Sequence, residues 1–226
     1  MREPISWKWL GLRAYDDALG EQEAAWRTCR ATGHEVCLAL EHPPTVTLGR
    51  RADPTDLVWS TEELRTRGVD CQRTERGGRA TYHAPGQLVL YPIVNLRQRG
   101  LGVEHFVRLL EDLMLDVATS VDVAAYRDPR GRGIWTATGK LGAVGIRVRD
   151  GVSTHGLALN VAVDLAGYQC IAPCGVRGLA VTSLAREGAP VCVADVLPAA
   201  ERACRRRFHH RDVPRARIPE PQEAHL

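Results

Sequence analysis

Two short stretches of this 226-residue chain gather groups that could transfer an acyl group. The first is the segment Arg76–Gln87, which contains adjacent glycines, a threonine hydroxyl and a histidine. The second is Pro173-Cys174-Gly175, which places a thiol between two residues that favour turns. Lys140 lies between them along the chain. Because a cysteine attacks as the thiolate and a nearby cation lowers its pKa, the three together suggest acyl transfer through a cysteine.

Lys140 attracts attention because lysine is scarce in this chain. Among its 30 basic residues, Lys8 and Lys140 are the two lysines and the others are arginines. An arginine stays protonated and cannot act as a base, whereas a lysine can release its proton in a suitable environment. Lys140 is therefore a candidate for handling a proton, although an incidental surface lysine would fit the count as well.

The segment around His83 has two interpretations. If it is extended, Thr81 and His83 share one face, because side chains alternate along a strand. A hairpin loop with a buried histidine would explain the same residues. Neither glycine pattern typical of nucleotide binding occurs in the segment. Three later glycines would leave room for a slim apolar ligand or allow tight packing of strands: Gly142, Gly145 and Gly156.

The choice of cysteine also stays open. Cys170 competes with Cys174 for the role of nucleophile, and either could be an inert buried thiol. Cys170, Cys174 and His155 could bind a metal, but zinc sites usually have closer Cys/His pairs and a fourth ligand. No metal is therefore predicted.

The bulk composition argues against several classes of protein. A net charge of +3 does not indicate nucleic-acid binding by electrostatics alone. No apolar run approaches the roughly 20 residues that span a bilayer, and the first twelve residues lack the apolar core of a secretory signal. Seven irregularly spaced cysteines do not indicate a disulfide framework. We expect a cytoplasmic protein with reduced thiols.

The order of predicted elements favours an α+β fold. Helical periodicity covers residues 14–31, 103–119 and 196–208, and a capping box of Ser60 and Glu63 begins a short helix that ends at Gly68. Strands are predicted at 36–40, 45–48, 69–74, 88–96, 141–148 and 152–163. Pro92 would place its strand at an edge or a bulge. Because hairpins are mixed with helices, α+β fits better than a doubly wound parallel fold.

The chain has no internal repeat and no linker that would divide its body. We expect one catalytic domain over residues 1–210 and a disordered tail over 211–226, where prolines are frequent and apolar residues are few. The basic run that ends the domain would be a solvated helix face or would attract an acidic partner: Arg202, Arg205, Arg206, Arg207, His209, His210 and Arg211.

Taken in order, these segments resemble the octanoyltransferases of lipoate biosynthesis, over about residues 9–208. The resemblance is carried by Glu41-His42-Pro43-Pro44, Thr47-Leu48-Gly49-Arg50-Arg51, Arg76-Gly77-Gly78, Thr81-Tyr82-His83, Pro85-Gly86-Gln87, Gly139-Lys140, His155-Gly156-Leu157-Ala158-Leu159-Asn160, Pro173-Cys174-Gly175 and Thr182-Ser183-Leu184. It implies a mixed β-sheet flanked by helices, as in biotin and lipoate protein ligases. Arg79 and Ala84 depart from the family pattern, which more often has Gln and Gly there, and neither is a reacting group.

The resemblance also implies roles for individual residues. Cys174 would carry the acyl group as a thioester, and Lys140 would lower the pKa of its thiol. His83 would orient the site or only pack. The walls of the acyl-binding site would come from three segments, namely Arg76, Gly77, Gly78, Arg79, Ala80, Thr81, Tyr82 and His83; Ala143, Val144 and Gly145; and Gly156, Leu157 and Ala158.

The implied reaction moves an octanoyl or lipoyl group from acyl-carrier protein to a lysine of a lipoyl domain. The acceptors would be 2-oxoacid dehydrogenase complexes and the glycine cleavage H protein, and the reaction would be the first step of endogenous protein lipoylation. The enzyme would be a monomer without a cofactor that binds neither nucleic acid nor a membrane. Three alternatives stay open: an ATP-dependent ligase on the same fold, a catalytically silent protein that binds acylated carriers, and a hydrolase that releases octanoate.

Overall fold

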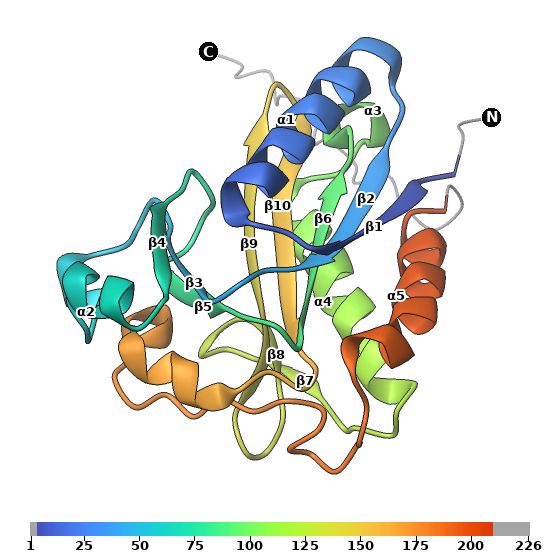
Figure 1. Cartoon of the computed structure of the whole chain (residues 1–226). Coiled ribbons are helices and arrows are strands. Elements are labelled where there is room, and N and C mark those ends of the chain that lie inside the picture. Colours follow the sequence, from blue (N-terminus) through green and yellow to red (C-terminus); the bar gives the residue numbers. More distant parts are fainter. Residues whose placement is uncertain (1–3, 210–226) are drawn as a thin grey trace, which may run out of the picture.

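The computed structural model describes residues 4–209, except for the side chain of Cys174. The tail that we predict to be disordered, 211–226, lies outside the described residues. Within the described part of the chain, two β-sheets are combined with five α-helices (Figure 1). The predicted α+β class with a mixed sheet is confirmed.

The larger sheet has seven strands in the described residues, in the order β1-β2-β6-β10-β9-β8-β7. The pair β1–β2 is parallel, and the other neighbouring pairs are antiparallel. Along this order the strands span Ser6–Leu12, Val36–Glu41, Gln87–Ile93, Val152–Asn160, Lys140–Arg149, Gly131–Trp135 and Tyr126–Asp128. The hairpin β9–β10 turns at Asp150 and Gly151, both in the left-handed conformation that such a turn requires.

Helices cover both faces of the larger sheet. On one face lies α1 (Tyr15–Thr32), and on the other lie α4 (Val103–Thr119) and α5 (Val193–Arg207). The short helix α3 (Leu96–Arg99) contacts β10, whereas α2 (Thr61–Thr66) packs on the smaller sheet. Leu38 and Val89 pack in the core under α1, whereas their neighbours Cys37 and Leu88 pack with α4 and α5. Because side chains alternate along a strand, both faces of these central strands must be apolar.

The smaller sheet has the order β4-β3-β5 and lies beside the larger one (Figure 1). Its strands span Asp70–Arg73, Thr45–Leu48 and Ala80–His83. Three short 3-10 helices accompany it: η1 (Pro54–Asp56), η2 (Leu165–Cys170) and η3 (Pro173–Gly175). The turn that contains Cys174 therefore belongs to this half of the molecule, whereas Lys140 begins β9 of the larger sheet.

Pro92 lies in an interior strand, so of the two expected positions, an edge or a bulge, the edge is wrong. β6 pairs with both β2 and β10. Regular pairing with β10 stops at Leu90, two residues before the proline. In the continued register His155 lies opposite Pro92, where it has φ of 56° and gives its backbone N–H to Gln22 (2.6 Å). Proline has no backbone N–H to donate, and it lies where the regular hydrogen bonding between β6 and β10 has already stopped.

Candidate active site

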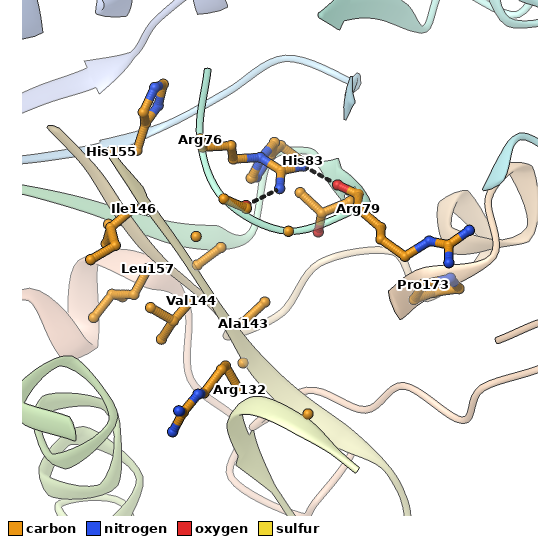
Figure 2. A pocket seen from close by; sticks show the side chains of 18 of the residues that line it. Arg76, Arg79, His83, Arg132, Ala143, Val144, Ile146, His155, Leu157 and Pro173 are labelled. Carbon is orange, nitrogen blue, oxygen red and sulfur yellow. Dashed lines mark hydrogen bonds between the residues drawn. The ribbon is translucent and has the colours of Figure 1, made fainter. Parts of the chain in front are cut away.

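A cavity of about 590 Å³ lies between the larger sheet, the Gly-rich loop and the Cys174 turn. Its lining comes from α1, the segment 76–83, the strands β6, β8, β9 and β10, the start of α4, and Pro173. Figure 2 shows part of this lining. The volume falls within the range of about 300–1,000 Å³ that is common for small organic ligands.

The Gly-rich loop is held in place by the buried side chain of Arg76. Its guanidinium donates to the carbonyl of Thr47 (2.6 Å), to the hydroxyl of Thr47 (2.8 Å), and to the carbonyls of Gly77 (3.0 Å) and Arg79 (2.9 Å). The Gly77 N–H donates to the carbonyl of Ile146 in β9 (2.8 Å). These bonds fix the loop backbone as one wall of the cavity.

A chain of hydrogen bonds continues from Arg76 through His83. The hydroxyl of Thr47 lies 3.4 Å from Nε2 of His83, and Nδ1 of His83 lies 2.6 Å from Oε1 of Gln87. The Gln87 amide then donates to Asn160 (2.9 Å). Because an amide oxygen can only accept, the His83 proton sits on Nδ1 and Nε2 accepts from the threonine.

Three buried histidines surround this end of the cavity. Burial lowers the pKa of His42 to about 4 and the pKa values of His83 and His155 to about 3 each. His42 bonds the hydroxyl of Tyr91 (2.8 Å), and its ring lies 5.5 Å from that of His83. All three rings are therefore neutral at pH 7, so they can position a ligand without adding charge.

The predicted acyl-binding walls that come from β9 and β10 lie on both faces of this strand pair. The register pairs Ala143 with Ala158, Gly145 with Gly156, and Val144 with Leu157. Figure 2 shows Val144 and Leu157 on the opposite side of the strands from Arg76 and His83. All these residues line the cavity. It therefore has an apolar section towards α4 and a second section under the Gly-rich loop.

The glycines of this wall serve close packing as well as lining the cavity. A Cβ atom at Gly156 would lie 2.1 Å from the carbonyl oxygen of Leu90, and one at Gly145 would lie 3.0 Å from that of Gly77. Gly145 and Gly156 both face the cavity. Tight packing and contact with the cavity, which the sequence left as alternatives, therefore occur together.

Lys140 is a buried lysine at the other end of the cavity, with an exposed fraction of 5%. Its Nζ donates to the carbonyl of Arg132 (2.8 Å) and lies 4.9 Å from the centre of a Trp135 ring. Its backbone N–H donates to the Ala180 carbonyl (2.9 Å), and its own carbonyl accepts from the N–H of Thr182 (3.0 Å). Lys140 is thus held by two other segments and is not an incidental surface lysine.

The turn that carries Cys174 begins at Pro173, which lines the cavity. The predicted nucleophile itself lies outside the described side chains. Arg79 packs against this turn, because a Cβ atom at Gly175 would lie 2.6 Å from its guanidinium carbon. Arg79 also pairs with the buried Asp56 (2.9 Å). Arg79, one of the two residues that depart from the family pattern, therefore contacts the turn.

None of the six cysteines with described side chains lines the cavity. Cys170, the alternative nucleophile, is fully buried, and burial raises the pKa of its thiol to about 12. Cys192 is exposed but precedes α5, away from the cavity lining. The position of Cys170 is that of a structural thiol.

Tyr82 is the one described side chain of the predicted walls that does not line the cavity. β5 alternates, so Thr81 and His83 face the cavity while Tyr82 packs against Tyr168, with ring centres 5.5 Å apart. Alternation along the strand could have indicated this, although Ala80, which shares a face with Tyr82, does line the cavity. Lining residues that we did not predict include Tyr15, Arg51, Arg132, His155, Asn160 and Tyr168.

The basic run near the C-terminus is largely neutralised by neighbouring carboxylates. Arg205 pairs with Glu201 (2.8 Å), and both Arg206 and Arg207 pair with Asp116 (2.7 Å each). None of these arginines lines the cavity. The alternative of a solvated, ion-paired helix face therefore fits this run better than a free basic surface; His210 and Arg211 lie outside the described residues.

Among the described side chains of residues 4–209, no group of three or more His, Cys, Asp or Glu is placed to hold a metal ion. No helix in the same part is long and apolar enough to cross a membrane.

Residues 14–205 match the model of the lipoyl protein ligase A/B catalytic domain. The chain belongs to this family. The octanoyltransferase of Desulfotalea psychrophila is 44% identical over 182 residues, which cover 79% of this chain and 82% of that protein. The octanoyltransferase of Chloroflexus aurantiacus is 45% identical over 184 residues, with the same coverage of each chain. The predicted resemblance is confirmed, and the protein is an acyltransferase.

The fold is also found in solved lipoate protein ligases. The bipartite lipoate protein ligase of Thermoplasma acidophilum, from a structural study that includes its E2 lipoyl domain, matches with a TM-score of 0.74 and 15% identity. The match covers 91% of this chain and 84% of that one. At this identity the likeness concerns the fold alone.

Proposed function

We propose that this enzyme moves an octanoyl group from acyl-carrier protein to a lysine of a lipoyl domain through a thioester on Cys174. The observation that carries the proposal is the lining of one cavity by both Lys140 and Pro173, the residue before Cys174. A buried cation and a thiol on an adjoining turn are the groups that nucleophilic catalysis by cysteine requires.

In the first half-reaction the Cys174 thiolate attacks the carbonyl carbon of the donor thioester. The new carbon–sulfur bond forms as the bond to the carrier's sulfur breaks. The ammonium of Lys140 gives its proton to the departing thiolate, which leaves as a thiol. One thioester has replaced another, so this step is close to neutral in energy and uses no ATP.

In the second half-reaction the amine of the acceptor lysine attacks the acyl group on Cys174. Lys140, now a free amine, takes the proton that the attacking nitrogen loses as the amide forms. The Cys174 thiolate leaves, and both groups return to their starting state. This cycle explains why a lysine is needed at position 140, because an arginine could supply the charge but not the base.

The apolar part of the cavity suits the rest of the substrate. Val144, Leu157 and Ile146 give it an aliphatic surface, and Val103 and Val107 of α4 add to it. Burial of an aliphatic chain contributes roughly 0.8 kcal/mol for each methylene group. An octanoyl chain can therefore be bound tightly without any charged contact.

Mass spectrometry of the intact protein tests the proposal. Mixing the enzyme with octanoyl-acyl-carrier protein, without ATP, should add the mass of one octanoyl group, and Cys174→Ala should abolish the adduct. Addition of an apo lipoyl domain should discharge it and leave an octanoylated acceptor. Acceptor modification that appears only with octanoate and ATP would instead indicate a ligase, and free octanoate with no modified acceptor would indicate a hydrolase.

A further inference from the structure

A small cluster of threonine hydroxyl groups surrounds Glu187. Two of these threonines lie just before Lys140 in the sequence. Thr136 and Thr138 occupy the turn between β8 and β9, directly before Gly139 and Lys140. Thr138 donates its hydroxyl proton to Oε1 of Glu187 in a short hydrogen bond, and Thr182 donates to the same oxygen (2.5 Å). One carboxylate oxygen thus joins two segments that are distant in sequence.

The two joined segments are those that hold Lys140. The N–H of Lys140 bonds the Ala180 carbonyl, and the N–H of Thr182 bonds the Lys140 carbonyl. The same loop is tied to the end of β10, because the Asn160 amide donates to the Thr182 carbonyl (2.9 Å). The loop begins just after the Cys174 turn, so its placement affects both predicted catalytic residues.

Because each hydroxyl has one proton, the donors and acceptors in this cluster can be assigned. The Thr136 and Thr138 hydroxyl oxygens lie 3.1 Å apart. Since a hydroxyl has one proton and Thr138 gives its proton to Glu187, the Thr138 oxygen accepts from Thr136. Burial alone would raise the pKa of Glu187, but the hydrogen bonds that its carboxylate accepts from Thr138 and Thr182 lower the pKa overall, so the carboxylate is ionised at neutral pH. Hydrogen bonds to a charged acceptor are the stronger kind.

We infer that Glu187 is a positioning residue, which clasps the β8–β9 turn to the loop 180–187 and so fixes Lys140 relative to Cys174. Glu187 does not line the cavity, so its proposed effect acts through the position of Lys140. A displacement of the reacting geometry by about 1 Å can lower a rate on the order of a hundredfold. The expected effect on the rate rests on the proposed function, whereas the expected effect on the position of Lys140 relative to Cys174 does not.

The test compares Glu187→Ala with Glu187→Gln, because a glutamine oxygen can still accept both threonine hydroxyls. The primary readout is the pH dependence of Cys174 alkylation by iodoacetamide, followed by peptide mass spectrometry with the exposed Cys192 as internal standard. We expect Glu187→Ala to move the Cys174 profile to higher pH and to lower kcat/KM by about tenfold to a hundredfold. Glu187→Gln should stay much closer to wild type.

A second pair of variants checks the same contact from the other side. Thr138→Val removes the hydroxyl at nearly constant shape and should behave like Glu187→Ala, whereas Thr138→Ser should restore the wild-type profile. Glu63→Gln, at the capping box of α2, serves as the matched control. An unchanged Cys174 profile in Glu187→Ala would overturn the inference, even if the melting temperature fell. A shifted profile in an enzyme that forms no octanoyl adduct would keep the inference and reject the proposed function.

Discussion

The two ends of the cavity are held together in different ways. At the histidine end, the side chains of Arg76, Thr47, His83 and Gln87 form a continuous buried network. At the other end, Lys140 is held by backbone bonds to a loop and by a carbonyl of β8. The histidines are neutral, so the network can position a substrate, while the proposed proton transfers depend on Lys140 and on loops that come from distant parts of the chain.

The largest expected effect comes from removing the proposed nucleophile. Cys174→Ala should lower octanoyl transfer by at least about a thousandfold, because the route through an acyl-enzyme is lost. Cys170→Ala removes a buried thiol at the other side of the turn and should retain transfer once the protein is folded. The transfer rate of each purified variant, checked by circular dichroism for folding, measures the difference. Equal losses in both variants would mean that the thiol at 174 has no special role.

Lys140→Arg separates the charge of the lysine from its ability to act as a base. The variant should still form some octanoyl-enzyme, because the charge that stabilises the thiolate remains. Discharge onto the acceptor lysine should fall by about 10²- to 10⁴-fold, the usual contribution of a general base. Rapid-quench mass spectrometry measures the two half-reactions separately. Full transfer in this variant would remove the base role from the account.

At the histidine end, we instead expect an effect on the free energy of unfolding at mildly acidic pH. Between about pH 6.5 and pH 4, unfolded chains bind protons at His42, His83 and His155 that the folded protein does not bind, since their folded pKa values are about 4, 3 and 3. The unfolded state therefore gains protons, and stability falls as the pH falls. Each histidine contributes about 1.4 kcal/mol per pH unit within this window, and the contribution is complete above pH 6.5.

Urea unfolding at about pH 7.5, 6 and 5 measures this dependence, above the range where most carboxylates titrate. His83→Asn should reduce the slope by about one proton while lowering stability at neutral pH. A free energy of unfolding that stays constant down to pH 5 would contradict the assignment of three neutral buried histidines.

The smallest effects concern docking of the acidic carrier protein at the mouth of the cavity. Arg51 and Arg132 are exposed and line the cavity, and Arg132 also pairs with the exposed Glu104 (3.5 Å). Arg205 and Arg206 form ion pairs away from the cavity. Arg51→Glu with Arg132→Glu should raise the KM for the carrier on the order of tenfold at low salt, with less effect in high salt. Arg205→Glu with Arg206→Glu is the matched control and should leave KM unchanged; the opposite pattern would place the docking surface at α5.

Local sequence patterns predicted some secondary-structure elements closely and missed others. The helix at 103–119 and the strand at 45–48 have the predicted bounds, because their periodicity and flanking residues are strong local signals. The strands β1, β7 and β8 and the helix α3 were not predicted, and the last helix begins at Val193 rather than at 196. These elements are short or depend on pairing with distant strands, which local patterns do not encode.

Long-range contacts explain what remained hidden in the site. His155 has a left-handed conformation opposite a proline, and its backbone N–H donates to Gln22 of α1. The contact between Thr138 and Glu187 joins residues 49 positions apart. Neither residue type nor spacing points to such contacts, although the motif containing Lys140 could be found by its composition alone.

The central claim is that the octanoyl group passes through Cys174, and isolated acyl-enzyme tests it most directly. Octanoyl-enzyme freed of donor by gel filtration should be mixed with an apo lipoyl domain in the absence of ATP. The account predicts that the octanoyl group moves to the acceptor lysine at a rate no slower than kcat. An adduct that stays on the enzyme, or hydrolyses without modifying the acceptor, would contradict it.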